Sequence, residues 1–193
     1  NESISISKSI SLSCSGDCTI DASGLASGID ISAANVSISG FEVIGDESTI
    51  SGITAGPGSS NITIEGNVIH GMTASNLNLS PASYGILVWG TDDVSDIVIE
   101  DNEVYGTKLF GISIGEFVEN VTISNNLAIN NGYQKITNNN SVSQIITNRK
   151  SLGTATGSGN SILLSSLFSL NINNSTYNSV IGNSGGLKLQ LNI

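Results

Sequence analysis

The chain has 193 residues and carries 16 acidic against 6 basic residues, which gives a net charge of -10. So few basic residues cannot neutralise a phosphate backbone, and no apolar run approaches the ~20 residues that span a bilayer. Neither a nucleic-acid partner nor a membrane span is therefore expected. Apolar residues make up 38% of the chain and recur in register, which excludes a disordered chain.

The first part of the chain combines a strand pattern with the only two cysteines. SISISKSISL, which starts at Ser3, alternates polar and apolar residues strictly, as a half-buried strand does. Cys14 and Cys18 follow in the segment CSGDC. A redox or metal pair is one interpretation, but no further cysteine or histidine cluster lies nearby. The spacing favours a short disulfide that closes the first turn, which fits an oxidising, extracellular setting.

Four later segments of the chain repeat one another. They are NVSISGFEVIG from Asn35, NITIEGNVIHG from Asn61, DIVIEDNEVYG from Asp96 and NVTISNNLAIN from Asn120. Their starts lie 26, 35 and 24 residues apart, and each places aliphatic residues at its second and fourth positions. A period of this length with a strand alternation inside it is typical of a solenoid, in which each repeat forms one coil.

The repeats also align at the bend that follows the aliphatic alternation. One column holds residues that tolerate positive φ, as a tight turn requires: Gly40, Gly66, Asp101 and Asn125. The next column consists mostly of asparagines that can hydrogen-bond from coil to coil: Phe41, Asn67, Asn102 and Asn126. An aliphatic position then supplies a third inward column: Val43, Ile69, Val104 and Ala128.

Three N-x-[S/T] sequons occupy one position of the repeat, at Asn35, Asn61 and Asn120, and Asp96 fills the fourth coil. If the residue after each of them faces inward, glycans on these asparagines would line one face of the solenoid. The alternative is that asparagine is favoured where a turn enters a strand. The sequence leaves both interpretations open.

The repeat pattern decays after about Gly132. We therefore expect regular coils over residues 1–132, and over 133–193 degenerate coils, a cap or an assembly segment of the same domain. The last segment, Gly186–Ile193, has the sequence GLKLQLNI and is typical of a terminal strand. Such a strand could pair with the exposed edge of a neighbouring subunit.

On these repeats, the chain resembles the right-handed parallel β-helix family, the pectate-lyase-like superfamily with its short β-helix repeats. The resemblance covers about residues 4–132. It implies an all-β chain that forms a single right-handed parallel β-helix. Members include polysaccharide lyases, galacturonases, epimerases, phage tailspikes, adhesins and plain structural modules, so the resemblance specifies the fold and not the function.

The resemblance also suggests where a lyase or epimerase site would lie. Lyases of this superfamily that act on uronic-acid polymers commonly hold Ca²⁺ with carboxylates and use a Lys or Arg base. The candidates here are Asp92, Asp93, Asp96 and Lys108, with Asp92 and Asp93 as ligands of Ca²⁺. A single lysine is a thin catalytic set, and the net charge of -10 would repel a polyanion. A solvated acidic face is the alternative that the sequence favours.

Aromatic residues mark a second candidate site. Trp89, Tyr84 and Tyr105 lie in or beside the acidic coil and could stack on sugar rings, and packing under a loop is the alternative. Trp89 alternates with Val88 and is expected to point outward. His70, the only histidine, falls in an outward column and is interpreted as a surface residue rather than a general acid.

These observations predict a non-catalytic extracellular or cell-surface structural module, which would be a surface, adhesive or filament-forming subunit with N-glycans. No cofactor is expected, apart from a structural Ca²⁺ as an alternative. A polysaccharide lyase or epimerase and a carbohydrate-binding module are the alternative functions.

Overall fold

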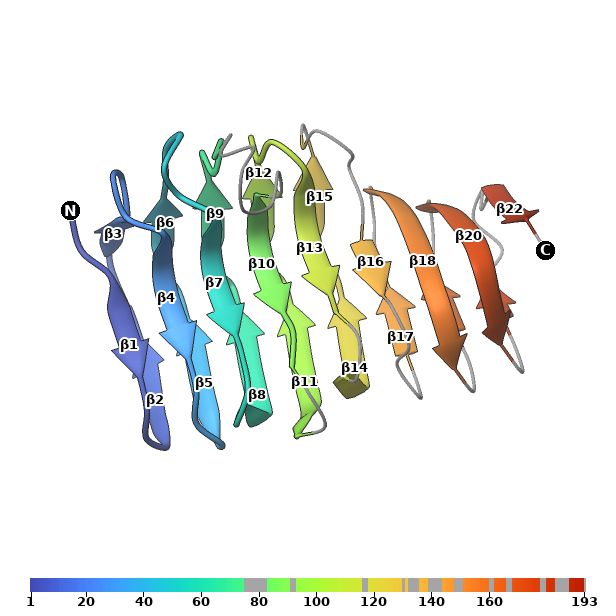
Figure 1. Ribbon diagram of the computed structural model, residues 1–193, viewed down its shortest axis with the longest axis horizontal. Helices are drawn as coiled ribbons and strands as arrows, with labels where there is room; N and C mark the ends of the chain where they lie inside the picture. Colours follow the sequence, from blue (N-terminus) through green and yellow to red (C-terminus); the bar gives the residue numbers. More distant parts are fainter. Residues whose placement is uncertain are drawn as a thin grey trace.

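The computed structural model shows an all-β chain wound into a right-handed parallel β-helix, with the two termini at opposite ends of the stack (Figure 1). The structure describes residues 1–74, 83–90, 93–115, 118–129 and 131, and farther along the backbone of strands 136–138, 144–147, 151–159, 162–165, 168–177, 180–182 and 188–192. The predicted fold is thereby confirmed.

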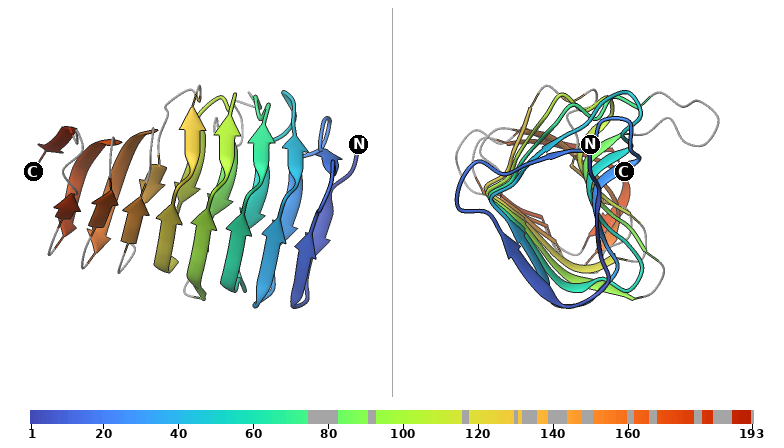
Figure 2. Two further views of the ribbon diagram at one scale, coloured as in Figure 1. Left: turned by 180° about the vertical axis from the view of Figure 1, so that it is seen from behind. Right: turned by 90° about the vertical axis from the view of Figure 1, so that its left-hand side faces the viewer.

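Each coil of the N-terminal part contributes three short strands. In chain order they are β1 (Ile4–Ile6), β2 (Ile10–Ser13) and β3 (Thr19–Asp21); β4 (Ser27–Ile31), β5 (Val36–Ser39) and β6 (Glu42–Ile44); β7 (Ser51–Ala55), β8 (Ser60–Glu65) and β9 (Val68–His70); β10 (Tyr84–Val88), β11 (Val94–Glu100) and β12 (Glu103–Tyr105); β13 (Phe110–Ile114), β14 (Val118–Ser124) and β15 (Leu127–Ile129). The coils overlie one another and enclose the core, as the view along the stack shows (Figure 2).

Further strands follow after residue 132. They are β16 (Ile136–Asn138), β17 (Gln144–Thr147), β18 (Ser151–Gly159), β19 (Ile162–Ser165), β20 (Phe168–Tyr177), β21 (Val180–Gly182) and β22 (Lys188–Asn192). β16 and β17 pair with β13 and β14, so the stacking continues past the point where the sequence repeat decays. The division of the chain into residues 1–132 and 133–193 stays a prediction.

The described strands form parallel sheets that run along the stack. Sheet A has the order β1-β4-β7-β10-β13-β16, sheet B the order β2-β5-β8-β11-β14-β17-β19-β21, and sheet C the order β15-β12-β9-β6-β3. β18, β20 and β22 form a separate sheet. Each coil up to β15 therefore supplies one strand to each of sheets A, B and C.

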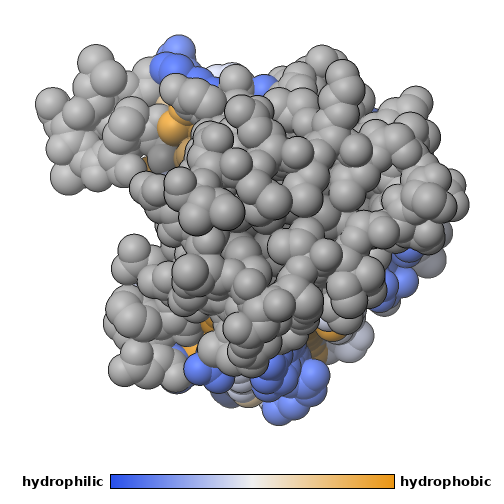
Figure 3. Space-filling model, turned by 90° about the vertical axis from the view of Figure 1, so that its right-hand side faces the viewer, coloured by the Kyte–Doolittle hydropathy of each residue, from blue (hydrophilic) through white to orange (hydrophobic). Residues whose placement is uncertain are grey.

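The core consists of aliphatic columns in register from coil to coil. In sheet B, Ile38, Ile64 and Ile99 align and are fully buried. In sheet C, no residue of the predicted inward column is more than 1% exposed: Val43, Ile69, Val104 and Ala128. Full burial of such a side chain contributes about 1.5–3 kcal/mol relative to exposure. Among the described residues, the large apolar side chains that stay exposed are Ile10, Ile50 and Trp89. In Figure 3, most of the described residues that are visible at the edge of the view are hydrophilic.

A glycine column lets sheet A approach sheet C closely. A Cβ on Gly28 would lie 2.5 Å from Cγ1 of Val43, and one on Gly52 would overlap Cγ2 of Ile69. A Cβ on Gly85 would overlap Cγ1 of Val104. Glycine is needed here because the inward column of sheet C fills the space that a side chain would occupy.

The predicted corners adopt the expected backbone. Gly40, Gly66, Asp101 and Asn125 have φ values of 78°, 62°, 55° and 55°. This left-handed conformation is the one that Gly, Asn and Asp accept most readily. The prediction of a tight turn in this column is therefore confirmed.

The neighbouring column forms a buried asparagine ladder. Asn67, Asn102 and Asn126 are each 1% exposed. Nδ2 of Asn67 donates to Oδ1 of Asn102 over 3.0 Å, and Nδ2 of Asn102 donates to Oδ1 of Asn126 over 2.9 Å. The predicted coil-to-coil hydrogen bonds are therefore present and run along the stack.

Candidate functional site on the outer face of sheet C

The outer face of sheet C carries the only histidine of the chain. Because Ile69 faces the core, its neighbours Val68 and His70 face outward, as the pleat of a strand requires. In the adjacent strands, Ile44 and Tyr105 occupy the same outward position as His70. Strands β6, β9 and β12 thus set three consecutive outward side chains side by side.

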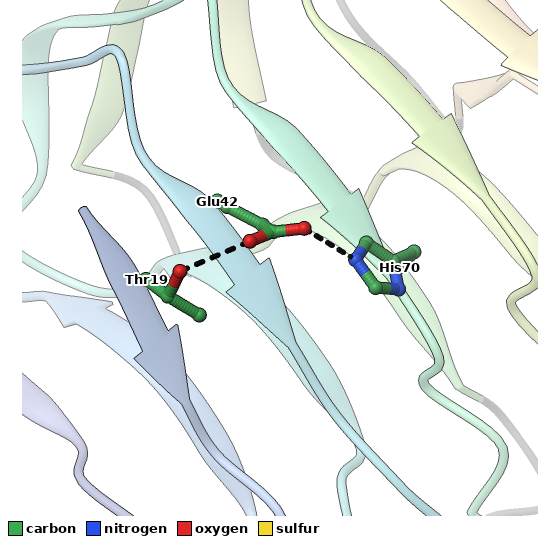
Figure 4. A network of polar contacts seen from close by, with 3 residues as sticks. All are labelled: Thr19, Glu42 and His70. Atoms are coloured by element: carbon green, nitrogen blue, oxygen red, sulfur yellow. Dashed lines mark hydrogen bonds and ion pairs between the residues drawn. The ribbon is translucent and has the colours of Figure 1, made fainter. Parts of the chain in front are cut away.

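His70 links two kinds of contact on this face. Its Nε2 lies 3.1 Å from Oε1 of Glu42, and Oγ1 of Thr19 donates to Oε2 of the same carboxylate over 3.0 Å (Figure 4). The imidazole stacks on the ring of Tyr105 with a centroid distance of 4.8 Å and an interplanar angle of 4°. The stack and the hydrogen bond fix the orientation of the His70 ring.

These contacts favour the charged form of Glu42. The hydrogen bond from His70 lowers the pKa of Glu42 from its usual value, and the hydrogen bond from Thr19 lowers it further. Hydrogen bonds to a carboxylate favour its charged form. Glu42 is therefore an acceptor at neutral pH and is poorly suited to act as a general acid.

A groove lies beside this network, next to the predicted cysteine pair. Cys14 and Cys18 form a disulfide with a Cα–Cα distance of 6.1 Å, which confirms the predicted pairing. The groove has a volume of about 290 Å³ and is lined by residues of the cysteine loop and of the following coils, among them Asp17, Cys18, Thr19, Phe41, Glu42 and Val68. Polar and apolar residues therefore both line this concave part of the surface.

Of the residues predicted for a lyase site, the structure describes Asp93, Asp96 and Lys108. Asp96 lies near the start of β11, where its Oδ1 accepts from Nδ2 of Asn120 over 3.2 Å. Lys108 lies in the turn from β12 to β13, and its backbone N–H donates to the carbonyl oxygen of Met72 over 2.9 Å. The rest of β11 and the whole of β12 lie between Asp96 and Lys108 along the coil. Asp93 is exposed, and Asp92 lies outside the described residues.

The structure also describes the three aromatic residues that were predicted to contact carbohydrate. Tyr84 opens β10 and stacks on Phe110 with a centroid distance of 5.6 Å, and burial raises the pKa of its hydroxyl. Trp89 follows the end of β10 and is 46% exposed, whereas Tyr105 stacks on His70 on sheet C. The outward orientation predicted for Trp89 is therefore present, and Tyr105 lies on a different sheet from Tyr84.

The sequon column forms a second ladder, on the outside of the solenoid. Asn35, Asn61, Asp96 and Asn120 have φ values between 53° and 58°. Nδ2 of Asn61 donates to Oδ1 of Asn35 over 2.8 Å, in the same way as Asn120 donates to Asp96. The backbone conformation alone gives a physical reason for Asn and Asp at this position.

Sequence reasoning did not single out Glu42 or Thr19. Glu42 lies directly opposite Val68 in the sheet and reaches His70 diagonally. Alternation around the inward Val43 could have placed Glu42 on the outer face, but the diagonal contact depends on the side-chain directions.

In the part of the chain that the structure describes, there is no helix with the length and hydropathy of a membrane span.

Comparison with protein families gave one match over nearly the whole chain. The family model described as "Periplasmic copper-binding protein (NosD)" matches residues 5–189. Comparisons with curated proteins and with solved structures gave no significant match. The family description supports an exported protein, and it is coarser than the predicted extracellular or cell-surface location.

The family description corrects the cofactor prediction. The prediction of no cofactor, with a structural Ca²⁺ as the alternative, is wrong, because the family is described as copper-binding. Copper is bound through His, Cys and Met, and the chain has one His, one Met and two Cys. Both cysteines are in the disulfide and Met72 is 0% exposed. Among the described residues there is no group of three or more His, Cys, Asp or Glu side chains that could hold a metal ion. The described residues, with the disulfide closed, therefore do not fit a copper site. The match over residues 5–189 nevertheless shows that the chain belongs to the NosD family.

Proposed function

We propose that this chain is a non-catalytic, exported structural module, in which a rigid β-helix presents a polar outer surface. The observation that supports this proposal is the use of the repeated polar residues. The side chains of Asn67, Asn102 and Asn126 hydrogen-bond to a neighbouring coil inside the solenoid, and those of Asn61 and Asn120 do so outside. Polar residues that recur because they join coils need no ligand to explain them.

The described acidic residues agree with a structural role. General acid–base catalysis needs carboxylates or a base within reach of one reacting atom. On the outer face of sheet C the histidine meets a single carboxylate, Glu42, and the pKa of that group is lowered. The carboxylate of Asp96 accepts hydrogen bonds from Asn120 and Ser95 and supports a turn.

The cellular part of the proposal is tested by fractionating cells that produce the protein natively. We expect the chain in the periplasmic or extracellular fraction, with the peptides of Cys14 and Cys18 joined by a disulfide. A protein confined to the cytoplasm with two thiols that react with an alkylating reagent would contradict the proposal, since disulfides persist in oxidising compartments.

Carbohydrate binding at Trp89 is a second candidate function, because of the residues that flank the indole. In register with Trp89 the adjacent coils carry Gly56 and Gly115. A Cβ on Gly56 would lie 3.7 Å from Nε1 of Trp89, and one on Gly115 would lie 3.1 Å from Cβ of Trp89. Small neighbours on both sides leave the indole open, as a ring that stacks on a sugar must be.

Trp89 is the only tryptophan, so intrinsic fluorescence reports on this site alone. We expect neutral oligosaccharides to shift the emission of the full chain, and Trp89→Ala to abolish their binding in calorimetry. Tyr105→Ala, on a different sheet, is the matched control and should bind as the wild type does. Unchanged emission across a panel of oligosaccharides would remove this candidate.

Assembly through Gly186–Ile193 is the proposed means of filament formation. β22 lies within this segment and pairs with β20. Sedimentation velocity of the full chain should reveal association that increases with concentration, and deletion of residues 186–193 should leave monomers. Large particles formed by the truncated chain would show that the segment is not the connector.

N-glycosylation at Asn35, Asn61 and Asn120 is the last part of the proposal. Asn61 and Asn120 already use Nδ2 to donate to the neighbouring coil, whereas Asn35 accepts through Oδ1. The geometry therefore favours Asn35 as the first acceptor. Peptide masses of natively produced protein test this order, and sugar on Asn61 or Asn120 with a bare Asn35 would contradict it.

A further inference from the structure

We propose that the groove beside the disulfide-closed turn binds an arginine side chain of a partner polypeptide. The groove has a volume of about 290 Å³. It is lined by this turn, by the two corners that follow it along the stack and by the outer face of sheet C. An enlarged turn, a fixed carboxylate and the charge of the lining carry the inference.

The turn from β2 to β3 is longer than the corresponding corners of the following coils. Residues 40–41 join β5 to β6 and residues 66–67 join β8 to β9, whereas residues 14–18 join β2 to β3. The additional residues 15–17 are exposed, and the Cys14–Cys18 disulfide closes the base of the turn. The bend alone does not need these residues, and insertions in solenoid repeats often form a binding face.

The lining of the groove leaves room for a side chain. A Cβ on Gly16 or on Gly66 would meet no heavy atom within 4 Å, so there is open space beside both residues. Phe41 and the half-buried Val68 add apolar surface to the lining. The methylene stem of a long basic side chain can lie along such a surface while its charged head stays polar.

Glu42 supplies a carboxylate whose orientation is fixed. Nε2 of His70 lies 3.1 Å from Oε1, and Oγ1 of Thr19 donates to Oε2 over 3.0 Å (Figure 4). One hydrogen bond reaches each oxygen, and an ionised carboxylate has roughly four acceptor positions in all. The side chain is 43% exposed, so a second donor can reach each oxygen. Two such acceptors match the planar fork of a guanidinium better than the point charge of an ammonium.

The charge of the groove favours a cation. Asp17 and Glu42 are among the described residues that line it, and none of these lining residues is basic. The hydrogen bonds from His70 and Thr19 favour the charged form of Glu42. The net charge of -10 adds a long-range attraction for a basic partner.

An NMR titration of the isotope-labelled full chain with the peptide acetyl-Gly-Arg-Gly-amide tests the site. Binding of a single side chain is weak, and amide shifts measure weak binding residue by residue. We expect saturable shifts for Gly16, Thr19 and Val68, which line the groove. The matched peptide with Gln in place of Arg should leave these amides unchanged, and the peptide with Lys should bind more weakly because it lacks the fork.

Two charge-matched variants separate the groove from a general attraction to an acidic protein. Glu42→Gln should weaken binding of the Arg peptide at least about tenfold, because it removes the charge of the acceptor and keeps the size of the side chain. Glu119→Gln removes the same charge from an exposed position of β14 that does not line the groove. We expect it to bind within about twofold of the wild type, because salt screens distant charges.

Asp17→Asn changes only an exposed residue of the turn and should weaken binding less than Glu42→Gln does. Circular dichroism establishes that each variant keeps its strand spectrum. The absence of saturable shifts at the groove, or equal effects of Glu42→Gln and Glu119→Gln, would overturn the proposal. Equal binding of the Arg peptide and either of the other two peptides would also overturn it.

Discussion

Asn67 and Asn102 are joined twice: the backbone N–H and the side-chain Nδ2 of Asn67 both donate to Oδ1 of Asn102, each over 3.0 Å. Asn102 repeats both donations to Asn126, over 3.0 and 2.9 Å. All three side chains are 1% exposed. One residue type therefore joins three successive coils through a column that is shut off from water.

Asn102→Ala should lower the free energy of unfolding by about 3 kcal/mol, measured by urea denaturation. The substitution leaves the N–H of Asn67 and the carbonyl oxygens of Ile64 and Glu100 without the partners that Asn102 provides. Asn61→Gly is the control, because it removes an exposed ladder bond and keeps a residue that accepts positive φ; we expect a change within about 0.5 kcal/mol. Equal losses in the two variants would contradict a special role for the buried ladder.

Gly85→Ala should destabilise the protein by about 3 kcal/mol or prevent folding, because the new methyl group would overlap Val104 and lie 2.7 Å from the carbonyl oxygen of Gly111. Gly66→Ala serves as the comparison. It has φ of 62° but nothing within 4 Å of the added Cβ, so only backbone strain of about 1 kcal/mol is expected. If thermal unfolding ranked the two variants in the opposite order, the close approach of sheets A and C would be wrong.

Reduction of the Cys14–Cys18 disulfide should lower the free energy of unfolding by about 2 kcal/mol and leave the chain folded. The loop is short, with a sequence separation of 4, and the backbone bonds to Ser39 and Glu42 do not depend on it. Denaturation of oxidised and reduced protein, each compared with Cys14→Ser/Cys18→Ser, measures this difference. Loss of the strand spectrum on reduction alone would show that the disulfide is required for the fold.

The carboxyl pKa of Glu42, measured by NMR, should lie below that of an ordinary glutamate and rise in His70→Ala. Thr19→Val should raise it less, since the hydrogen bond from Thr19 is the weaker of the two causes. The pKa is lowered in the folded state, so the stabilisation is complete above the pKa of the unfolded chain and is lost as the pH falls through the folded value. An unchanged pKa in His70→Ala would mean that the contact in Figure 4 is not formed in solution.

The repeat could be predicted because inward positions are tied to the geometry of the coil. The column of Val43, Ile69 and Val104 and the left-handed corners at Asp101 and Asn125 were readable because only a few residue types fit there. Outward positions obey no such restriction, and so the contact between Glu42 and His70 was not predicted. The separate sheet of β18, β20 and β22 was also missed, because the residues after 132 no longer follow the repeat.

The acidic segment shows a second limit of sequence reasoning. Asp96 and Lys108 are close in the sequence, but the rest of β11 and the whole of β12 lie between them along the coil. The corner at Asp101 turns the chain between them, so that Asp96 lies in β11 of sheet B and Lys108 follows β12 of sheet C. Closeness along a solenoid repeat therefore does not imply a shared site.

Turnover of uronic-acid polymers by the full chain tests the central claim of a non-catalytic module most directly. The absorbance of unsaturated uronate would be followed on pectate and on alginate, with and without added Ca²⁺. A non-catalytic module predicts a flat trace on both polymers under both conditions. A rise in absorbance that is lost in Asp93→Ala would contradict it.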